Sequence, residues 1–233
     1  AVTNLGLRGY KLLDPLIERL EHEERQTPFT PEERDYWILH AHREFSTPGR
    51  ADRGLLSMLL LNLVHLRLGQ AIFLPAGELH AYLRGTGIEI MANSNNVLRG
   101  GLTAKHVDPE ELLRVLSFRG GPVEVLEPET RQDEPRLAEY RTPAAEFSLS
   151  HLSLDSGGPY DFERGEMRLA LIVKGSVKVA AEDPTKLTLE KGDALRGAIA
   201  KSGSIEVSAS KGAELWLARV PDPVSAGTKT ARR

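Results

Sequence analysis

Apolar residues near the start of the sequence follow the three- and four-residue spacing of an amphipathic helix. Within the segment LLDPLIERLEHEERQ they are Leu12, Leu13, Leu16, Ile17 and Leu20. Pro15 suits the first turn of such a helix, and Asp14 precedes it as the candidate cap. The pattern therefore predicts a helix that begins near Asp14.

Two further segments carry signals for the start of a helix. In the first, Thr30 and Glu33 have the spacing of a capping box, with a proline between them. This spacing predicts a helix over residues 31–45. In the second, Asp108 is placed to cap a helix whose first residue is Pro109. The apolar stripe expected to be buried by this helix consists of Leu112, Leu113 and Leu116.

Shorter apolar runs occupy much of the remaining sequence. Between residues 55 and 90 they are separated by glycine turns, which is typical of strands and hairpins. Further runs follow at regular intervals after residue 144, which is typical of a β-sandwich or barrel. These later runs are EFSLSHLSL, RLALIVKGSVKVA, KLTLEKGDALRGAIA, SIEVSAS and ELWLARV.

The same patterns predict how the chain is divided. A stretch rich in proline and acidic residues separates two β-rich regions and suggests a connection between domains. We expect a helical segment at 1–50, a mainly β segment at 51–120, the connection at 121–143, a C-terminal β domain at 144–222 and a small, polar tail at 223–233.

Composition narrows the class of protein. The 233 residues carry a formal net charge of −3, which gives no reason to expect nucleic acid or an anionic membrane as a partner. No cysteine is present, so disulfides and thiolate metal sites are excluded. No apolar run approaches the roughly 20 residues that span a bilayer, and the segment AVTNLGLRGYK lacks a signal-peptide core. We expect a cytoplasmic enzyme.

One motif points to chemistry. Gly69, Pro75, Gly77 and His80 follow the spacing G-x5-P-x-G-x2-H, with short apolar runs on both sides. Proline and glycine break the run and allow a sharp bend, which places His80 at the start of the next run. A histidine held at a rigid bend is a good metal ligand, because its neutral imidazole has a nitrogen lone pair.

This spacing resembles the second motif of the cupin superfamily. The segments PAGELHAYL and IEIMANSNNVLRGGLTAKHVD are similar to the signature region of type I phosphomannose isomerase, also called mannose-6-phosphate isomerase. The resemblance extends over residues 37–118 and more weakly to about residue 220. It implies a mainly β fold with a helical segment and cupin (jelly-roll) barrels. The first barrel would be incomplete in this chain, and the second would be a degenerate cupin without the metal motif.

The resemblance also implies roles for particular side chains. In this family one zinc ion per complete enzyme is held by a glutamine, two histidines and a glutamate, and His80 matches one of the histidines. Arg99 matches the catalytic arginine, which would stabilise negative charge on an enediolate. Tyr82 and Glu89 match positions that line or support the site. Lys105 ends the signature and either meets a phosphate or is solvated.

The remaining zinc ligands are missing from the sequence. The family has a Gln-x-His pair, but no glutamine of this chain has a histidine two residues later. His40 and His42 form a His-x-His pair on a predicted helix, where positions i and i+2 point to different faces. The resemblance therefore implies that an absent N-terminal half supplies the other ligands, and that this chain alone is inactive.

The function implied is isomerisation of mannose 6-phosphate and fructose 6-phosphate through an enediol, as part of carbohydrate metabolism and GDP-mannose biosynthesis. Zinc would polarise the substrate oxygens. The alternatives are a non-catalytic, cupin-like protein that binds sugar phosphates or partners without the metal half, and a different cupin enzyme such as a metal dioxygenase. The second would need a cluster of histidines that the sequence does not show.

Overall fold

The structure is a computed structural model in which the chain forms two compact units. It describes residues 2–94, 96–155, 158–162, 169–181, 187–197, 205–209 and 211–221. Unit 1 comprises Ala1–Arg67, Leu74–Thr86 and Asn95–Glu124, and unit 2 comprises Leu68–Phe73, Gly87–Ser94 and Val125–Arg233. Within the described residues, no helix is both long and apolar enough to cross a lipid bilayer.

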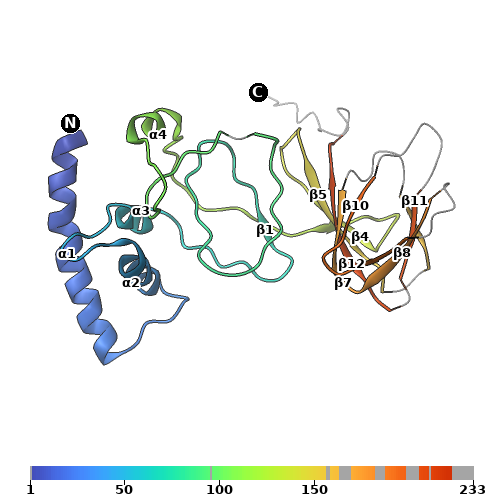
Figure 1. Ribbon diagram of the computed structural model, residues 1–233, viewed down its shortest axis with the longest axis horizontal. Coiled ribbons are helices and arrows are strands. Elements are labelled where there is room, and N and C mark those ends of the chain that lie inside the picture. Colours follow the sequence, from blue (N-terminus) through green and yellow to red (C-terminus); the bar gives the residue numbers. More distant parts are fainter. Residues whose placement is uncertain are drawn as a thin grey trace, which may run out of the picture. The chain divides into compact units, whose positions relative to one another are not determined.

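Three helices pack around one hydrophobic cluster in unit 1 (Figure 1). They are α1 (Val2–Gln26), α2 (Arg34–Phe45) and α3 (Leu55–Leu60). The cluster contains fully buried leucines and isoleucines from each helix, including Leu20, Ile38 and Leu55. Burying one such side chain contributes about 1.5–3 kcal/mol, so this cluster is what holds the three helices together.

The first helix differs from its predicted start. It begins at Val2, and Pro15 lies inside it, so Asp14 is not a cap. A proline within a helix removes one backbone hydrogen bond and costs about 3 kcal/mol. The helix continues because Leu13, Ile17 and Leu20 are all buried on the same face, and their burial outweighs that cost.

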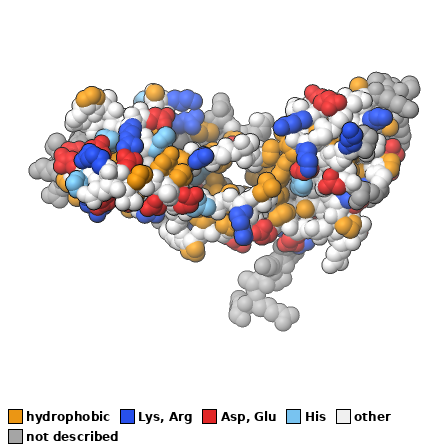
Figure 2. All heavy atoms as spheres, turned by 90° about the horizontal axis from the view of Figure 1, so that it is seen from below, with side chains coloured by type: hydrophobic (Ala, Val, Ile, Leu, Met, Phe, Trp, Pro, Cys, Tyr) orange, Lys and Arg blue, Asp and Glu red, His pale blue; other side chains and the backbone are white. Residues whose placement is uncertain are grey.

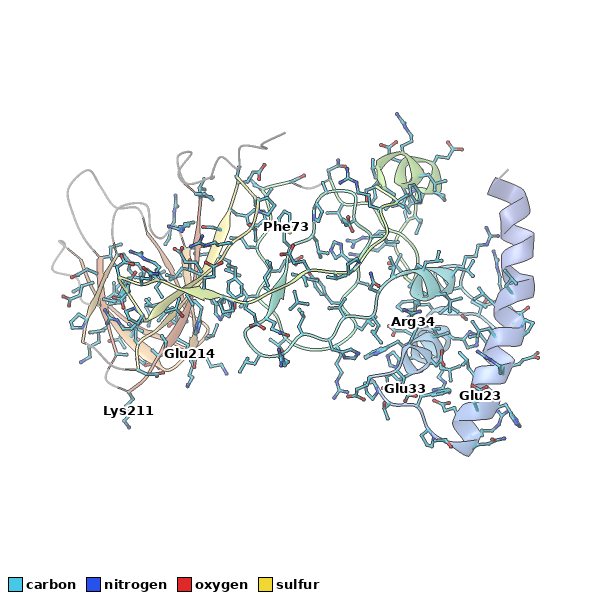
Figure 3. All side chains as sticks on the ribbon, turned by 180° about the vertical axis from the view of Figure 1, so that it is seen from behind. Glu23, Glu33, Arg34, Phe73, Lys211 and Glu214 are labelled. Atoms are coloured by element: carbon cyan, nitrogen blue, oxygen red, sulfur yellow. The ribbon has the colours of Figure 1, made fainter. Side chains whose placement is uncertain are left out.

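The second helix begins at Arg34, three residues after the predicted position. Half of the capping box is present, since the Glu33 carboxylate accepts hydrogen bonds from the Thr30 amide at 2.7 Å and from its hydroxyl at 3.0 Å. The Arg34 guanidinium donates to the carbonyls of Leu59 and Leu61 at the end of α3, at 3.4 and 3.1 Å (Figure 3). Arg34 therefore satisfies carbonyls that the short helix α3 leaves unpaired.

A fourth helix, α4 (Pro109–Val115), begins at the predicted cap. The Asp108 carboxylate accepts a hydrogen bond from the amide of Glu111 at 3.1 Å. The predicted buried stripe is wrong, because α4 has no buried residue and the side chain of Leu113 is 48% exposed. The cap is a local feature that the sequence determines, whereas the stripe needs a packing partner.

The prediction of strands and hairpins between residues 55 and 90 is also largely wrong. Residues 55–60 are helical, and the one strand in this range is β1 (Ala71–Ile72), which pairs with β2 (Val125–Leu126). Apart from residue 95, which lies outside the described residues, residues 73–108 form neither helix nor strand. A strand requires a neighbouring strand to complete its hydrogen bonds. Among the described residues, the only neighbouring strand for this region is the two-residue β2.

Besides the β1–β2 pair, the described residues of unit 2 form two larger antiparallel sheets (Figure 1). The six-stranded sheet has the order β10-β7-β12-β5-β4-β3. Its strands are β3 (Glu129–Thr130), β4 (Leu137–Tyr140), β5 (Ser148–Ser153), β7 (Leu169–Lys174), β10 (Ala194–Arg196) and β12 (Glu214–Arg219). The four-stranded sheet has the order β6-β11-β8-β9. Its strands are β6 (Tyr160–Phe162), β8 (Ser176–Ala181), β9 (Leu187–Glu190) and β11 (Ile205–Ser208).

The two sheets share one hydrophobic core. Alternate residues of β5 and β12, such as Leu152 and Leu215, are fully buried together with Phe162, Val179 and Val207 of the other sheet. This alternation confirms the strands that the sequence predicted after residue 144. The expected fold class, mainly β with a helical segment, is confirmed, and the sheets of this unit form a sandwich.

The segment that carries Gly69 is tied to unit 2. The Tyr140 hydroxyl donates a hydrogen bond to the Gly69 carbonyl at 2.6 Å, and Ala71 pairs with Leu126. Gly69 itself has a φ of 85°, a conformation that favours glycine. The start of the G-x5-P-x-G-x2-H motif is thereby fixed on unit 2, while its histidine belongs to unit 1.

Candidate functional site

The bend before His80 is built as the motif predicts. The amide of Glu78 donates to the carbonyl of Pro75 at 3.3 Å, and Gly77 has a φ of 86°. The amide of Ser117, just after α4, donates to the carbonyl of Gly77 at 3.0 Å. A β-carbon at Gly77 would lie 2.8 Å from the carbonyl oxygen of Val115, so glycine is also needed for this close approach.

The imidazole of His80 is held by its own backbone. Its Nδ1 lies 2.9 Å from the carbonyl oxygen of Glu78. A carbonyl oxygen only accepts hydrogen bonds, so in the neutral ring the proton resides on Nδ1 and the lone pair on Nε2. The side chain is exposed. His80 therefore presents the nitrogen arrangement of a metal-binding histidine whose other nitrogen is fixed by a backbone carbonyl.

Tyr82 lies beside His80. The two ring centroids are 6.0 Å apart and the rings are inclined by 67°, an edge-to-face arrangement. Tyr82 is 71% exposed, so both rings are at the surface of unit 1.

Arg99 is carried by a loop that packs against the histidine segment. A β-carbon at Gly100 would lie 2.6 Å from Cδ1 of Leu79, the residue before His80. Gly101, with a φ of 123°, approaches Gly54 so closely that its β-carbon would lie 3.0 Å from the Gly54 Cα. The two glycines thus hold the loop between the histidine segment and the start of α3. Arg99 is exposed.

Lys105 and Glu89 lie at the surface, in different units. Lys105 is an exposed residue of unit 1, and its amide donates to the hydroxyl of Thr103 at 3.1 Å. Glu89 is an exposed residue of unit 2.

The described residues do not form a metal site by themselves. No group of three or more histidine, aspartate or glutamate side chains among them is placed to hold a metal ion. Zinc in proteins is bound by about four ligands. In the part of the chain that the structure describes, His80 is a single candidate ligand.

The sequence did not point to the residues that position His80 and Arg99. Leu79, Gly54 and Ser117 each support this region through contacts with residues distant in the chain. Such contacts have no local spacing rule, so no pattern in a single sequence reveals them.

Comparison with known proteins finds relatives named mannose-6-phosphate isomerase. No family model matches the chain. Mannose-6-phosphate isomerase 1 of Arabidopsis thaliana is 32% identical over 173 residues, which are 74% of this chain and 38% of that protein. Mannose-6-phosphate isomerase of Escherichia coli (strain K12) is 43% identical over 99 residues, 42% of this chain and 25% of that protein.

Solved structures agree with this result. The crystal structure of mannose 6-phosphate isomerase from Salmonella typhimurium bound to its substrate, fructose 6-phosphate, and zinc has a TM-score of 0.67 and 27% identity. The match covers 87% of this chain and 49% of that chain. This chain therefore spans at most about half of the length of these relatives. The predicted resemblance is confirmed: the chain is similar to the C-terminal portion of mannose-6-phosphate isomerases.

Proposed function

We propose that this chain is the C-terminal portion of a zinc-dependent mannose-6-phosphate isomerase, which interconverts mannose 6-phosphate and fructose 6-phosphate through an enediol. Support comes from the relatives, which share this name, and from a related structure that holds fructose 6-phosphate and zinc. The observation that carries the proposal is the packing of Leu79 against Gly100, which brings the segments of His80 and Arg99 together.

His80 is the proposed zinc ligand of this chain. The Glu78 carbonyl accepts the Nδ1 proton, which leaves the Nε2 lone pair for the metal. We expect the other ligands to come from the N-terminal part of such an enzyme, which this chain does not align with; the absence of a group of three candidate ligands among the described residues supports this. We therefore expect zinc to bind weakly to this chain alone and mannose 6-phosphate not to be turned over.

Arg99 is the proposed catalytic residue. Moving a proton between C1 and C2 passes through an enediolate, whose oxygen carries negative charge. A guanidinium stays charged at every relevant pH and stabilises that charge without having to reorganise. The glycines on its C-terminal side fix the loop, so Arg99 is positioned before substrate binds.

Three other side chains are proposed to support the substrate. Tyr82 packs its ring against His80 and would keep that imidazole in place. Lys105 is an exposed cation of the same unit and would meet the phosphate of the substrate. Glu89 is the third proposed supporting residue.

The test uses a fusion of the N-terminal half of the Salmonella typhimurium enzyme to this chain. His80→Ala should lower both zinc content and activity, because a ligand is lost. Arg99→Ala should keep its zinc and lower kcat by roughly 10²- to 10³-fold, the scale for removing one preorganised charge-stabilising group.

Matched controls come from the same unit. His106→Ala and Arg84→Ala remove an exposed histidine and an exposed arginine, and both should leave zinc content and kcat unchanged. Metal analysis and steady-state kinetics decide the matter. An Arg99→Ala fusion that loses its zinc or keeps its full kcat would contradict the assigned roles.

A further inference from the structure

The loop that carries Arg99 contains a strained residue three positions further along the chain. Leu102 has a φ of 49°, in the left-handed region that a bulky side chain rarely adopts. Such a conformation persists only where the surrounding structure stabilises it, and residues of this kind are concentrated at functional sites. Leu102 therefore indicates a loop that contacts outside the loop hold in one conformation.

The helical cluster of unit 1 supplies the first of these contacts. The side chain of Leu102 is half-buried and packs against this cluster, which joins α1, α2 and α3. Burial of its apolar surface offsets the cost of the left-handed backbone. Because φ sets the direction of the side chain relative to the preceding backbone, a relaxed φ would move either the side chain out of the cluster or the loop out of its place.

Gly54 supplies the second contact. It lies just before α3, its amide donates to the Asp52 carboxylate at 2.7 Å, and the next residue, Leu55, is fully buried. A β-carbon at Gly54 would lie 2.8 Å from both the amide nitrogen and Cγ of Leu102. The backbone of the loop thus lies directly on the start of a helix whose position is fixed by the core.

The placement of a single cation matters on the surface of this protein. On the face drawn in Figure 2, acidic side chains lie among the basic ones. A mixed surface of this kind presents no broad positive field to an anion, so a negative charge must be met by individual cations in fixed positions. A guanidinium stabilises a developing charge best when it is already in place, because no reorganisation is then needed.

We infer that Leu102 is a positioning residue for Arg99: its left-handed backbone and its packing against the helical cluster hold the arginine loop in its working conformation. The inference rests on the proposed function for the role of Arg99 itself. Leu79 supports the same loop at Gly100, so the loop is fixed at two points. The helices thereby gain a part in the reaction, because they fix the loop that carries the arginine.

The first test measures the loop itself, in the full chain and without any activity. Trypsin cleaves after arginine, and the sequence Leu-Arg-Gly occurs at both Arg84 and Arg99. Both arginines are exposed, but a β-carbon at Gly85 would meet no atom within 4 Å, whereas one at Gly100 would meet Leu79. Arg84 is therefore an internal reference with the same local sequence. Arg99 should be cleaved more slowly, because a protease needs a segment that opens locally.

Leu102→Ala should raise the rate of cleavage at Arg99 relative to Arg84 by about tenfold, because the open loop becomes more populated when its packing is lost. Leu102→Met keeps an apolar side chain of similar size and should leave this ratio nearly unchanged. Leu16→Ala is the matched control, since Leu16 also packs against the helical cluster but lies in α1. Mass spectrometry of the fragments gives the ratio. An unchanged ratio in Leu102→Ala, or an equal rise in Leu16→Ala, would overturn the inference.

The second test asks whether Leu102 acts through Arg99, in the fusion with the N-terminal half of the Salmonella typhimurium enzyme. Leu102→Ala should lower kcat by roughly 10- to 100-fold, the scale for a group misplaced by about 1 Å or less. Zinc content and the KM for mannose 6-phosphate should change little. In the Arg99→Ala background the same substitution should cost nothing further, since the group that it misplaces is gone. An equal loss in both backgrounds would show that Leu102 supports the fold in general, and would overturn the positioning role.

The two tests separate this inference from the proposed function. A parent fusion without turnover, together with the expected rise in cleavage at Arg99, would sink the proposed function while showing that Leu102 holds the arginine loop. A fusion that turns over mannose 6-phosphate, but whose kcat and cleavage ratio do not respond to Leu102→Ala, would overturn the inference and leave the proposed function intact.

Discussion

Single residues decide the geometry of the candidate site through backbone contacts. His80 is oriented by the carbonyl of Glu78, and Arg99 lies in a loop whose glycines abut Leu79 and Gly54. A side chain of any size at either glycine would push the loop away from its neighbours. The proposed roles of His80 and Arg99 thus depend on residues that would take no part in the reaction themselves.

Gly100→Ala should destabilise the chain by about 1 kcal/mol, since the new methyl group would meet Leu79 at 2.6 Å and the leucine would have to move. Urea denaturation measures the change. The double variant with Leu79→Ala should recover part of the loss, as expected for residues in contact. Gly87→Ala is the control, because no atom lies within 4 Å of its added carbon. Equal effects at Gly100 and Gly87 would rule out the steric explanation.

A second residue-scale prediction concerns acid stability. The side-chain hydrogen bond from Arg136 lowers the pKa of Glu134 below its ordinary value of 4.5. Arg136 also donates to the carbonyl of Gly158 at 3.0 Å. The Glu134–Arg136 pair therefore links the segment just before β4 to the segment just before β6. A carboxyl group whose pKa is lowered by folding stabilises the fold at pH values above its ordinary pKa. That contribution is lost as the pH falls through the pKa of the group in the folded protein.

Glu134→Gln should therefore cost about 1 kcal/mol near pH 7 and progressively less below pH 4.5. Thermal unfolding of both proteins across this pH range measures the difference. A constant difference at every pH would show that the charge is not responsible.

At the scale of elements, the sequence predicted those that depend on local signals or on burial inside this chain. The cap of α4 and the alternating strands of the sandwich belong to this group. The proline inside α1 misled the prediction, because tertiary burial of Leu13 and Leu20 outweighs a local preference. The apolar runs between residues 55 and 90 have strand-like composition, but a strand also needs a neighbour. The candidate site residues were predicted from the motif and the family resemblance. The residues that position them were identified only in the structure.

Asp108→Ala should weaken α4 by about 1 kcal/mol, because the helix has seven residues, none of them buried, and the cap is a large part of what holds it. Hydrogen exchange at the amide of Glu111, which donates to the aspartate, measures the loss directly. Asp108→Asn keeps an acceptor oxygen and should keep most of the protection. Equal loss in both variants would assign the effect to charge.

In the molecule as a whole, the described residues form two hydrophobic cores, and the stretch between them in sequence contains no buried residue. One core joins the helices α1 to α3, and the other joins the two sheets. The buried residues of the helical core all precede residue 56, and those of the sheet core all follow residue 136. Burial within the described chain therefore stabilises the two regions that carry these cores more than the stretch between them.

The isolated chain should self-associate, because large exposed apolar residues such as Leu113 favour contacts between copies. Sedimentation velocity across a range of concentrations should show oligomers or aggregates. Leu113→Glu should reduce them, whereas Leu187→Glu should not. A monomer at every concentration would mean that the exposed apolar residues between the two cores do not promote association.

The position of β12 in the six-stranded sheet affects the order of events during protein synthesis. This strand pairs with β5 on one side and with β7 on the other, as in Leu215 with Leu152 and Leu217 with Ala170. During translation β5 and β7 leave the ribosome before β12 and have no shared edge until it arrives. A stop codon before residue 214 would therefore divide the sheet into two unconnected parts and release a polypeptide that quality-control proteases should degrade.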